Sequence, residues 1–235
     1  MTEKNQQLLQ ELKNGGVKFL PWIGDKYEDG IYYDETGELR YGNGKGKKVL
    51  VLNECIYGGE TEKDAKRVLG ESKHSWLVYE IINRFIDNSS NFPLGVNHRP
   101  FVRFERTLAG KEPLSIKERI ELWNHLTFYT YIQEQLDSFT PTEKQYKDAK
   151  KSFLFLIDKC RPDIIIVWGR RLYYNLPISG QQGKDIWTDD EYTETWNFCR
   201  NNHNIKILQI PYPSYIGFVS ANWHKIIREF ITRRM

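Results

Sequence analysis

Four short apolar segments, separated by stretches with helical periodicity, are the feature that most constrains the fold of this 235-residue chain. They are rich in β-branched and aromatic residues, as strands are, and they span Val49–Leu52, Leu126–Ile132, Ile164–Trp168 and Ile205–Ile210. Strands that alternate with helices are typical of α/β proteins, in which helices cover both faces of a mainly parallel sheet. We therefore expect a three-layer α/β/α fold around a central sheet of about four strands.

The stretches between the strands carry helix signals. Capping-box patterns at Ser115–Glu118 and at Thr140–Glu143 predict two helix starts, and the second helix is expected to run through Cys160. Apolar residues at helical spacing predict two further helices, over His74–Ile86 and Trp223–Ile231.

Two regions lack this periodicity. Residues 19–47 combine glycine turns with short aromatic segments, so 1–47 is expected to be an N-terminal loop and hairpin region before the core. Residues 88–113 are rich in Asn, Pro and Arg and are expected to be irregular. The length favours one domain over two, so we expect residues 1–235 to form a single domain.

Composition and motifs narrow the class of protein. A hydrophobic fraction of 40% and a charged fraction of 28% are ordinary for a soluble protein, and neither a membrane-spanning run nor a signal peptide is recognisable. The three cysteines form no CxxC pair, and the chain has no GxGxxG, P-loop, HExxH or GxSxG motif. We expect a cytoplasmic protein with reduced thiols and without a metal or cofactor.

Basic residues gather in clusters, with aromatic residues within or beside several of them. The clusters are Lys45–Lys48, His98–Arg106, Arg170–Arg171 and Arg228–Arg234. The net charge of +3 indicates no partner by itself. Basic residues interleaved with aromatic ones suit a surface that binds phosphates and stacks bases, whereas the alternative is an ordinary solvated surface. DNA is the expected partner on the first interpretation, with no membrane and no obligate protein partner.

Chemically useful residues follow each predicted strand. The segments are Asn53–Gly58, Thr130–Gln133, Trp168–Arg171 and Pro211–Ser214. Because ligands of open α/β sheets bind outside the carboxyl ends of the strands, we expect these segments to converge on one site. The site would contain a carboxylate from Glu54, several aromatic rings and two arginines. For the first segment, the alternative is a strand followed by a plain glycine turn.

Several segments resemble the uracil-DNA glycosylase superfamily, in the same order along the chain. They are Phe19–Gly24, Val49–Gly59, Trp123–Gln133, Arg161–Gly169 and Pro211–Ser214. The resemblance implies an α/β/α enzyme that flips a nucleotide out of DNA and hydrolyses its N-glycosidic bond without a metal or cofactor.

The resemblance also implies roles for individual residues. Glu54, with the neighbouring Asn53, would orient a water molecule or stabilise the oxocarbenium-like sugar. The implied base-binding residues are Tyr57, Thr130, Trp168 and Tyr212. The implied DNA-binding residues are Gly58, Arg170, Arg171, Pro213 and Ser214.

Three positions depart from the family pattern. Asn53 replaces a usual glycine, Thr130 stands where a base-reading Asn is expected, and Tyr212 replaces a histidine that supports the departing base. A threonine hydroxyl cannot make the bidentate contact that identifies uracil, and losing such a contact weakens discrimination strongly. Two interpretations stay open.

In the first interpretation, the pocket accepts a larger or more polar modified pyrimidine, such as a hypermodified cytosine of phage DNA, in antiphage defence or in DNA repair. In the second, catalysis is lost and a DNA- or nucleotide-binding protein of the same fold remains. A small-molecule α/β hydrolase is a third interpretation, but the nucleophile motif is missing.

Overall fold

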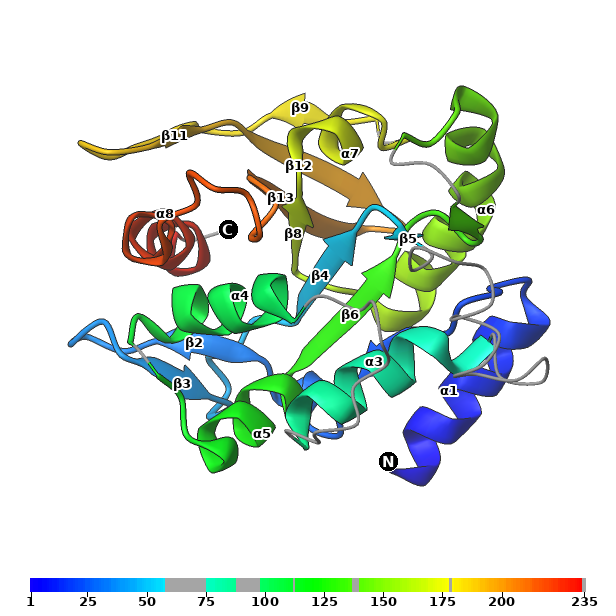
Figure 1. The fold of residues 1–235 in the computed structure, drawn as a ribbon, viewed down its shortest axis with the longest axis horizontal. Coiled ribbons are helices and arrows are strands. Elements are labelled where there is room, and N and C mark those ends of the chain that lie inside the picture. Colours follow the sequence, from blue (N-terminus) through cyan, green and yellow to red (C-terminus); the bar gives the residue numbers. More distant parts are fainter. Residues whose placement is uncertain (58–74, 88–97, 112, 137–139, 178, 234–235) are drawn as a thin grey trace.

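A seven-stranded sheet runs through the middle of the molecule, in the order β1-β6-β4-β8-β13-β12-β9 (Figure 1). The structure is a computed structural model that describes residues 1–57, 75–87, 98–111, 113–136, 140–177 and 179–233. The strands of the sheet are β1 (Trp22–Ile23), β4 (Val49–Asn53), β6 (Leu126–Thr130), β8 (Ile164–Trp168), β9 (Gln181–Gln182), β12 (Thr195–Arg200) and β13 (His203–Ile210).

The four middle strands β6, β4, β8 and β13 are parallel, whereas β1, β12 and β9 pair antiparallel. The parallel strands are the four apolar runs of the sequence, so the predicted α/β fold is confirmed. The predicted number of about four strands is wrong. The additional strands β1 and β9 have only two residues each, and β12 mixes buried with partly exposed positions, so it has no continuous apolar run.

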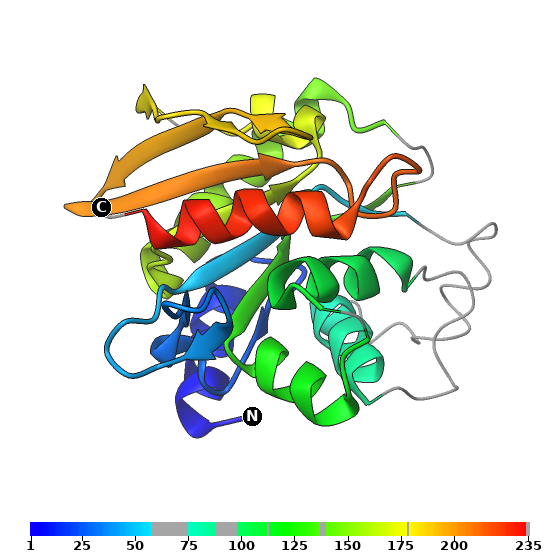
Figure 2. The same ribbon diagram turned by 90° about the vertical axis from the view of Figure 1, so that its left-hand side faces the viewer.

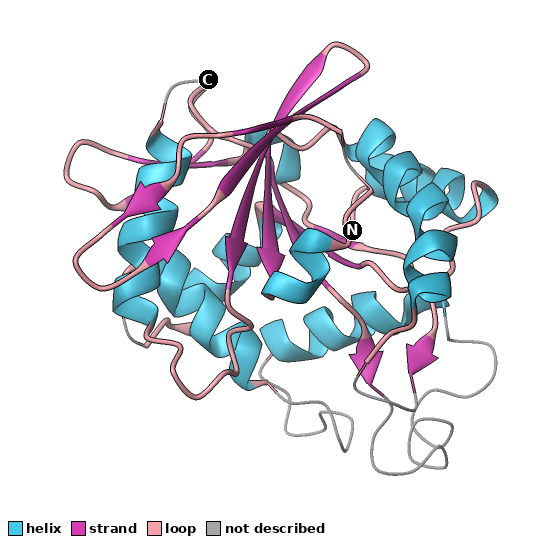
Figure 3. Ribbon diagram, turned by 90° about the horizontal axis from the view of Figure 1, so that it is seen from above, coloured by secondary structure: helices cyan, strands magenta, loops and turns pink. Residues whose placement is uncertain are grey.

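Helices cover both faces of the sheet (Figure 2, Figure 3). One face packs against α3 (Leu77–Ile86), α4 (Arg99–Ala109), α5 (Ile116–Asn124) and α8 (Ser220–Thr232). The other packs against α1 (Glu3–Asn14), α6 (Glu143–Cys160) and α7 (Arg170–Tyr174). Strand β4 is buried on both sides: Val49 and Val51 join the first core cluster, and Leu50 and Leu52 join the second.

The N-terminal region contains more than the expected loop and hairpin. The hairpin exists, between β2 (Ile31–Tyr33) and β3 (Leu39–Tyr41). However, α1 buries Leu9 and Leu12 in the core, and β1 is an edge strand of the central sheet. The view of residues 1–47 as a region that precedes the core is therefore wrong.

Smaller elements complete the structure. Strands β5 (Ile56–Tyr57) and β7 (Gln135–Leu136) form a short parallel pair, β10 (Ile186–Trp187) and β11 (Tyr192–Thr193) form a hairpin, and η1 (Tyr27–Asp29) is a 3-10 turn. Where the structure describes the chain, no helix is long and apolar enough to cross a membrane.

The helix starts were predicted with mixed success. The Ser115–Glu118 capping box is confirmed, with both reciprocal hydrogen bonds present. The helix that ends at Cys160 is also confirmed, but its cap is Thr142 paired with Gln145, two residues later than expected. The prediction that residues 88–113 are irregular is wrong over α4, where apolar residues three or four positions apart lie among arginines.

Candidate functional site

The connections between the parallel strands change direction between β4 and β8. Along the chain, β4 comes first, and β6 then pairs with it on one side and β8 on the other. The carboxyl ends of β4 and β8 thus border the topological switch point, where open α/β sheets bind their ligands. Glu54 directly follows β4, and the Gly169–Arg171 segment directly follows β8.

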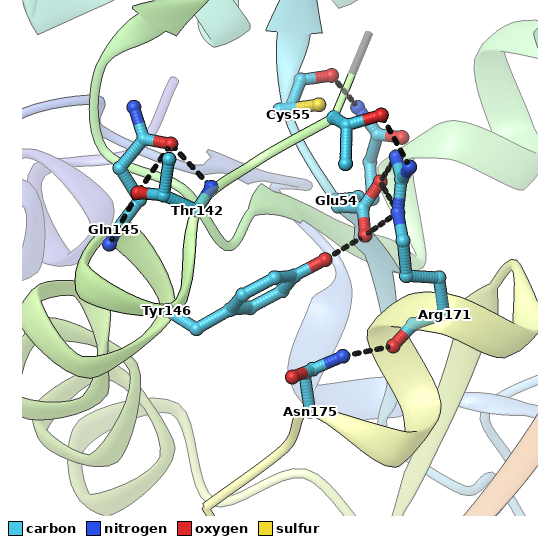
Figure 4. Close-up of polar contacts among 9 residues, drawn as sticks. Glu54, Cys55, Thr142, Gln145, Tyr146, Arg171 and Asn175 are labelled. Atoms are coloured by element: carbon cyan, nitrogen blue, oxygen red, sulfur yellow. Dashed lines mark hydrogen bonds and ion pairs between the residues drawn. The ribbon is translucent and has the colours of Figure 1, made fainter.

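At this point the Glu54 side chain accepts hydrogen bonds from two residues (Figure 4). Arg171 Nε lies 2.9 Å from Oε1 and 3.1 Å from Oε2, and its Nη2 also donates to Oε2. The Tyr146 hydroxyl donates to Oε1. Only 8% of Glu54 is exposed, so a buried carboxylate pairs with the partly exposed Arg171 and also accepts a bond from a neutral donor.

Both partners are placed by helix starts on the same side of the sheet. Arg171 lies in the first turn of α7, which follows the left-handed Gly169 (φ 98°), a conformation that favours glycine. The side chain of Asn175 donates to the Arg171 carbonyl oxygen at 2.9 Å. Tyr146 lies in the first turns of α6, and burial, together with the bond to Glu54, raises its pKa. The phenol therefore stays protonated as a donor.

Asn53 braces the turn that carries Glu54. Its side-chain amide donates to the Cys55 carbonyl oxygen at 2.8 Å, and the residue is 7% exposed. Backbone bonds of 2.8 Å from Tyr131 and Ile132 to the carbonyl oxygens of Asn53 and Glu54 join this turn to the end of β6. Asn53 thus holds the position of the acid.

Of the residues predicted to bind the base, Trp168 and Tyr212 pack on the other face of the sheet. Thr130 is fully buried, and its Oγ1 has no hydrogen-bond partner among the described residues. Trp168 is 1% exposed and packs among the rings of Phe101, Phe104 and Phe128. It is a core residue, and a direct base contact would require this aromatic cluster to open.

Tyr212 connects the aromatic cluster to the acid. Its ring stands edge-on to Trp168, with a centroid distance of 5.9 Å and an interplanar angle of 86°. Burial, together with the smaller effects of the nearby Cys55 and Glu54, raises the pKa of Tyr212 to about 12. The hydroxyl is therefore protonated at neutral pH, and Tyr212 lies within electrostatic reach of Glu54.

The loop after β13 is held by α4. Arg103 Nη1 donates to the carbonyl oxygens of Pro213, at 3.2 Å, and Tyr215, at 2.8 Å. Tyr215 is 64% exposed and Ile216 is 89% exposed. Sequence reasoning identified Pro213 and Ser214 in this loop but overlooked the exposed apolar pair beside them. A tyrosine and an isoleucine between a serine and a glycine were the available signal.

The other predicted residues have varied positions. Arg170 is exposed on α7, whereas Arg171 pairs with Glu54 and is not simply a surface cation. The backbone of Tyr57 lies in β5, but its side chain and Gly58 are outside the described residues. Tyr146 was overlooked because it lies in the regular apolar pattern of α6.

The arrangement offers a buried carboxylate, a tyrosine donor and a guanidinium. In the described part of the chain, no group of three or more His, Cys, Asp or Glu side chains could hold a metal ion. A comparison with models of known protein families and with curated protein sequences finds no match.

Proposed function

We propose that this protein is a DNA glycosylase-like enzyme that excises a modified pyrimidine. The observation that carries the proposal is the buried Glu54 carboxylate at the switch point between β4 and β8. Two further features support it: Tyr212, which lies within electrostatic reach of Glu54, and the exposed Tyr215–Ile216 pair on a loop that Arg103 holds at the same sheet edge. The resemblance of the sequence to the uracil-DNA glycosylase superfamily supplies the reaction.

In the proposed reaction, the bond between the sugar C1′ and the base nitrogen breaks, and a water oxygen forms a new bond to C1′. Glu54 stabilises the cationic sugar and orients the water, whose proton passes to the carboxylate and then to solvent. Tyr212 is protonated and can donate a hydrogen bond to the base as it departs with the bonding electrons. The step needs only water as co-reactant.

The loop after β13 suits the DNA contact that base flipping requires. Apolar side chains inserted between base steps unstack the duplex, and the deformation is repaid by additional contacts. Ile216 and Tyr215 are the exposed apolar residues of this loop, and the Arg103 bonds fix their backbone in advance. Arg170 offers a phosphate contact at the same sheet edge.

The residue type at position 130 favours a modified base over uracil. Thr130 offers a single hydroxyl where an amide would read uracil, and that hydroxyl has no partner among the described residues. A hydroxyl or sugar substituent on a pyrimidine would supply one once the side chains around the fully buried Thr130 move apart. The substrates we propose are hypermodified cytosines of phage DNA, in a cytoplasmic role in defence or repair.

A second function is favoured by the Glu54 network itself. Arg171 and Tyr146 already occupy both carboxylate oxygens, so a water molecule must displace a donor before Glu54 can orient it. A protein of this fold that binds DNA or a nucleotide without cleaving it would have no need to release the acid. The ion pair would then be purely structural.

One experiment tests the proposal and separates the two functions. The protein is incubated with genomic DNAs that carry different base modifications, and released base and abasic sites are measured. Glu54→Gln, which keeps the shape of the side chain, serves as the matched control. Release that disappears in Glu54→Gln supports the glycosylase. Tight binding without release from any modified DNA supports the second function.

A further inference from the structure

A second site candidate lies on the β12 side of the sheet. A cavity of about 750 Å³ opens between β12, β13 and the C-terminal turn of α8. It is lined by Gly180, Gln181, Lys184, Thr195, Asn197, Phe198, Cys199, Asn204, Ile205, Lys206, Phe230 and Arg233. Lys206 lies four residues before Ile210, so it is about 13 Å along β13 from the carboxyl edge near Glu54.

The lining of this cavity is cationic. It contains two lysines and one arginine, and none of its lining residues is Asp or Glu. Three amide side chains and the Thr195 hydroxyl provide both donors and acceptors. The volume falls in the range of about 300–1,000 Å³ that is typical of small-molecule pockets.

Lys206 is the cation that a strand of the central sheet contributes. It is half-buried on β13, directly across from Asn197 on β12. Its Nζ donates to the Arg233 carbonyl oxygen at 2.9 Å. Burial lowers the pKa of Lys206, and the neighbouring cations Lys47 and Arg233 lower it further. An anion in the cavity would relieve this repulsion.

The positive charge of Arg233 is partly balanced by its own contacts. Its guanidinium donates to the carbonyl oxygens of Lys184 and Asp185 and pairs with Glu229. These contacts fix Arg233 as part of the wall. Of the two lysines in the lining, Lys184 is at an exposed position and Lys206 at a half-buried one.

We propose that this cavity binds the phosphate monoester of a nucleotide-sized ligand, with Lys206 and Lys184 at the phosphate. A charge-assisted bond from a lysine to phosphate is about twice as strong as a neutral hydrogen bond. The amides of Asn197, Asn204 and Gln181 would bond the remainder of the ligand. The same phosphate chemistry could come from a free mononucleotide or from the 5′-phosphate end of a DNA strand.

Isothermal titration calorimetry on the full chain tests the proposal. The probes are deoxycytidine monophosphate, deoxycytidine, inorganic phosphate and a short single strand with or without a 5′-phosphate. We expect the monophosphate to bind at least about tenfold more tightly than the nucleoside. Preference for the free monophosphate identifies a mononucleotide site, and preference for the phosphorylated strand identifies a strand-end site.

Charge-removing variants locate the binding. Lys206→Gln should weaken binding of the monophosphate about tenfold, whereas Lys147→Gln, at an exposed position on α6, should leave it unchanged. If Lys206→Gln folds poorly, Lys184→Gln at an exposed position provides a second test of the contribution of a lysine to phosphate binding. Glu54→Gln should bind the monophosphate normally, which separates this site from the proposed active site. Equal binding of nucleoside and monophosphate, or equal binding by the lysine variants and the wild type, overturns the proposal.

Discussion

Removal of the Arg171 guanidinium should destabilise the protein, because it leaves a buried carboxylate without its cation. Breaking a fully buried ion pair costs about 3–5 kcal/mol. Here Glu54 is 8% exposed, but the side chain of Arg171 is 41% exposed, so water can enter the vacated position. Tyr146 also remains as a donor to Glu54. We therefore expect Arg171→Met to lower the free energy of unfolding by about 2 kcal/mol, below the fully buried range.

A double-mutant cycle isolates the pair. Glu54→Gln alone should cost about 1 kcal/mol, since Arg171 can turn to solvent and the amide still accepts a bond from Tyr146. The double variant should cost about 1.5 kcal/mol, which is less than the sum of about 3 kcal/mol from the single changes. The resulting coupling energy is about 1.5 kcal/mol. Urea unfolding at neutral pH and low salt measures all four proteins.

The neighbouring Arg170 provides the control. It lies on the same helix turn and is exposed, so Arg170→Met should change stability by less than about 0.5 kcal/mol and show no coupling to Glu54. Additive costs for Arg171→Met and Glu54→Gln, within about 0.3 kcal/mol, would refute a net contribution of the ion pair. Equal coupling of Arg170 and Arg171 to Glu54 would refute the geometry of the Glu54–Arg171 ion pair.

Three further predictions concern activity and DNA binding. Glu54→Gln should abolish base release but keep DNA affinity within about threefold, measured by abasic-site and gel-shift assays; full activity would remove Glu54 from the mechanism. The slope of log affinity against log salt is negative, and Arg170→Gln should reduce its magnitude by about one. Arg171→Gln should reduce the magnitude less, because Glu54 already balances the charge of Arg171. Ile216→Ser should weaken binding to duplex DNA more than to single strands, since no base step needs opening there; equal losses would exclude a wedge.

The parallel core could be predicted from the sequence because burial on both faces leaves a strong signal. Val49–Leu52 and Ile164–Trp168 consist of aliphatic residues and one tryptophan, and both became middle strands. The outer strand β12 could not be recognised in this way, since one of its sides is partly exposed and its sequence is mixed. Helix α4 was overlooked for a similar reason: arginines stand between its apolar residues along the chain, although these residues keep helical spacing.

The site could be predicted only in part. The position of Glu54 follows from where a strand ends, which is a local property. Its partners are not local: Tyr146 is 92 residues away and Arg171 is 117 residues away, and sequence spacing contains no information about such contacts. Trp168 shows the opposite error, since its place at a strand end suggested a binding role, whereas alternation along the strand turned its ring into the core.

The two outermost strands of the sheet, β1 and β9, are each only two residues long. An exposed sheet edge is a template on which another chain can add a strand, and long flat edges promote aggregation. A two-residue edge offers a second molecule very few backbone hydrogen bonds, and β9 in addition presents exposed glutamines rather than apolar side chains. The short antiparallel edge strands thus limit edge-to-edge association, and the apolar parallel strands remain in the interior of the sheet.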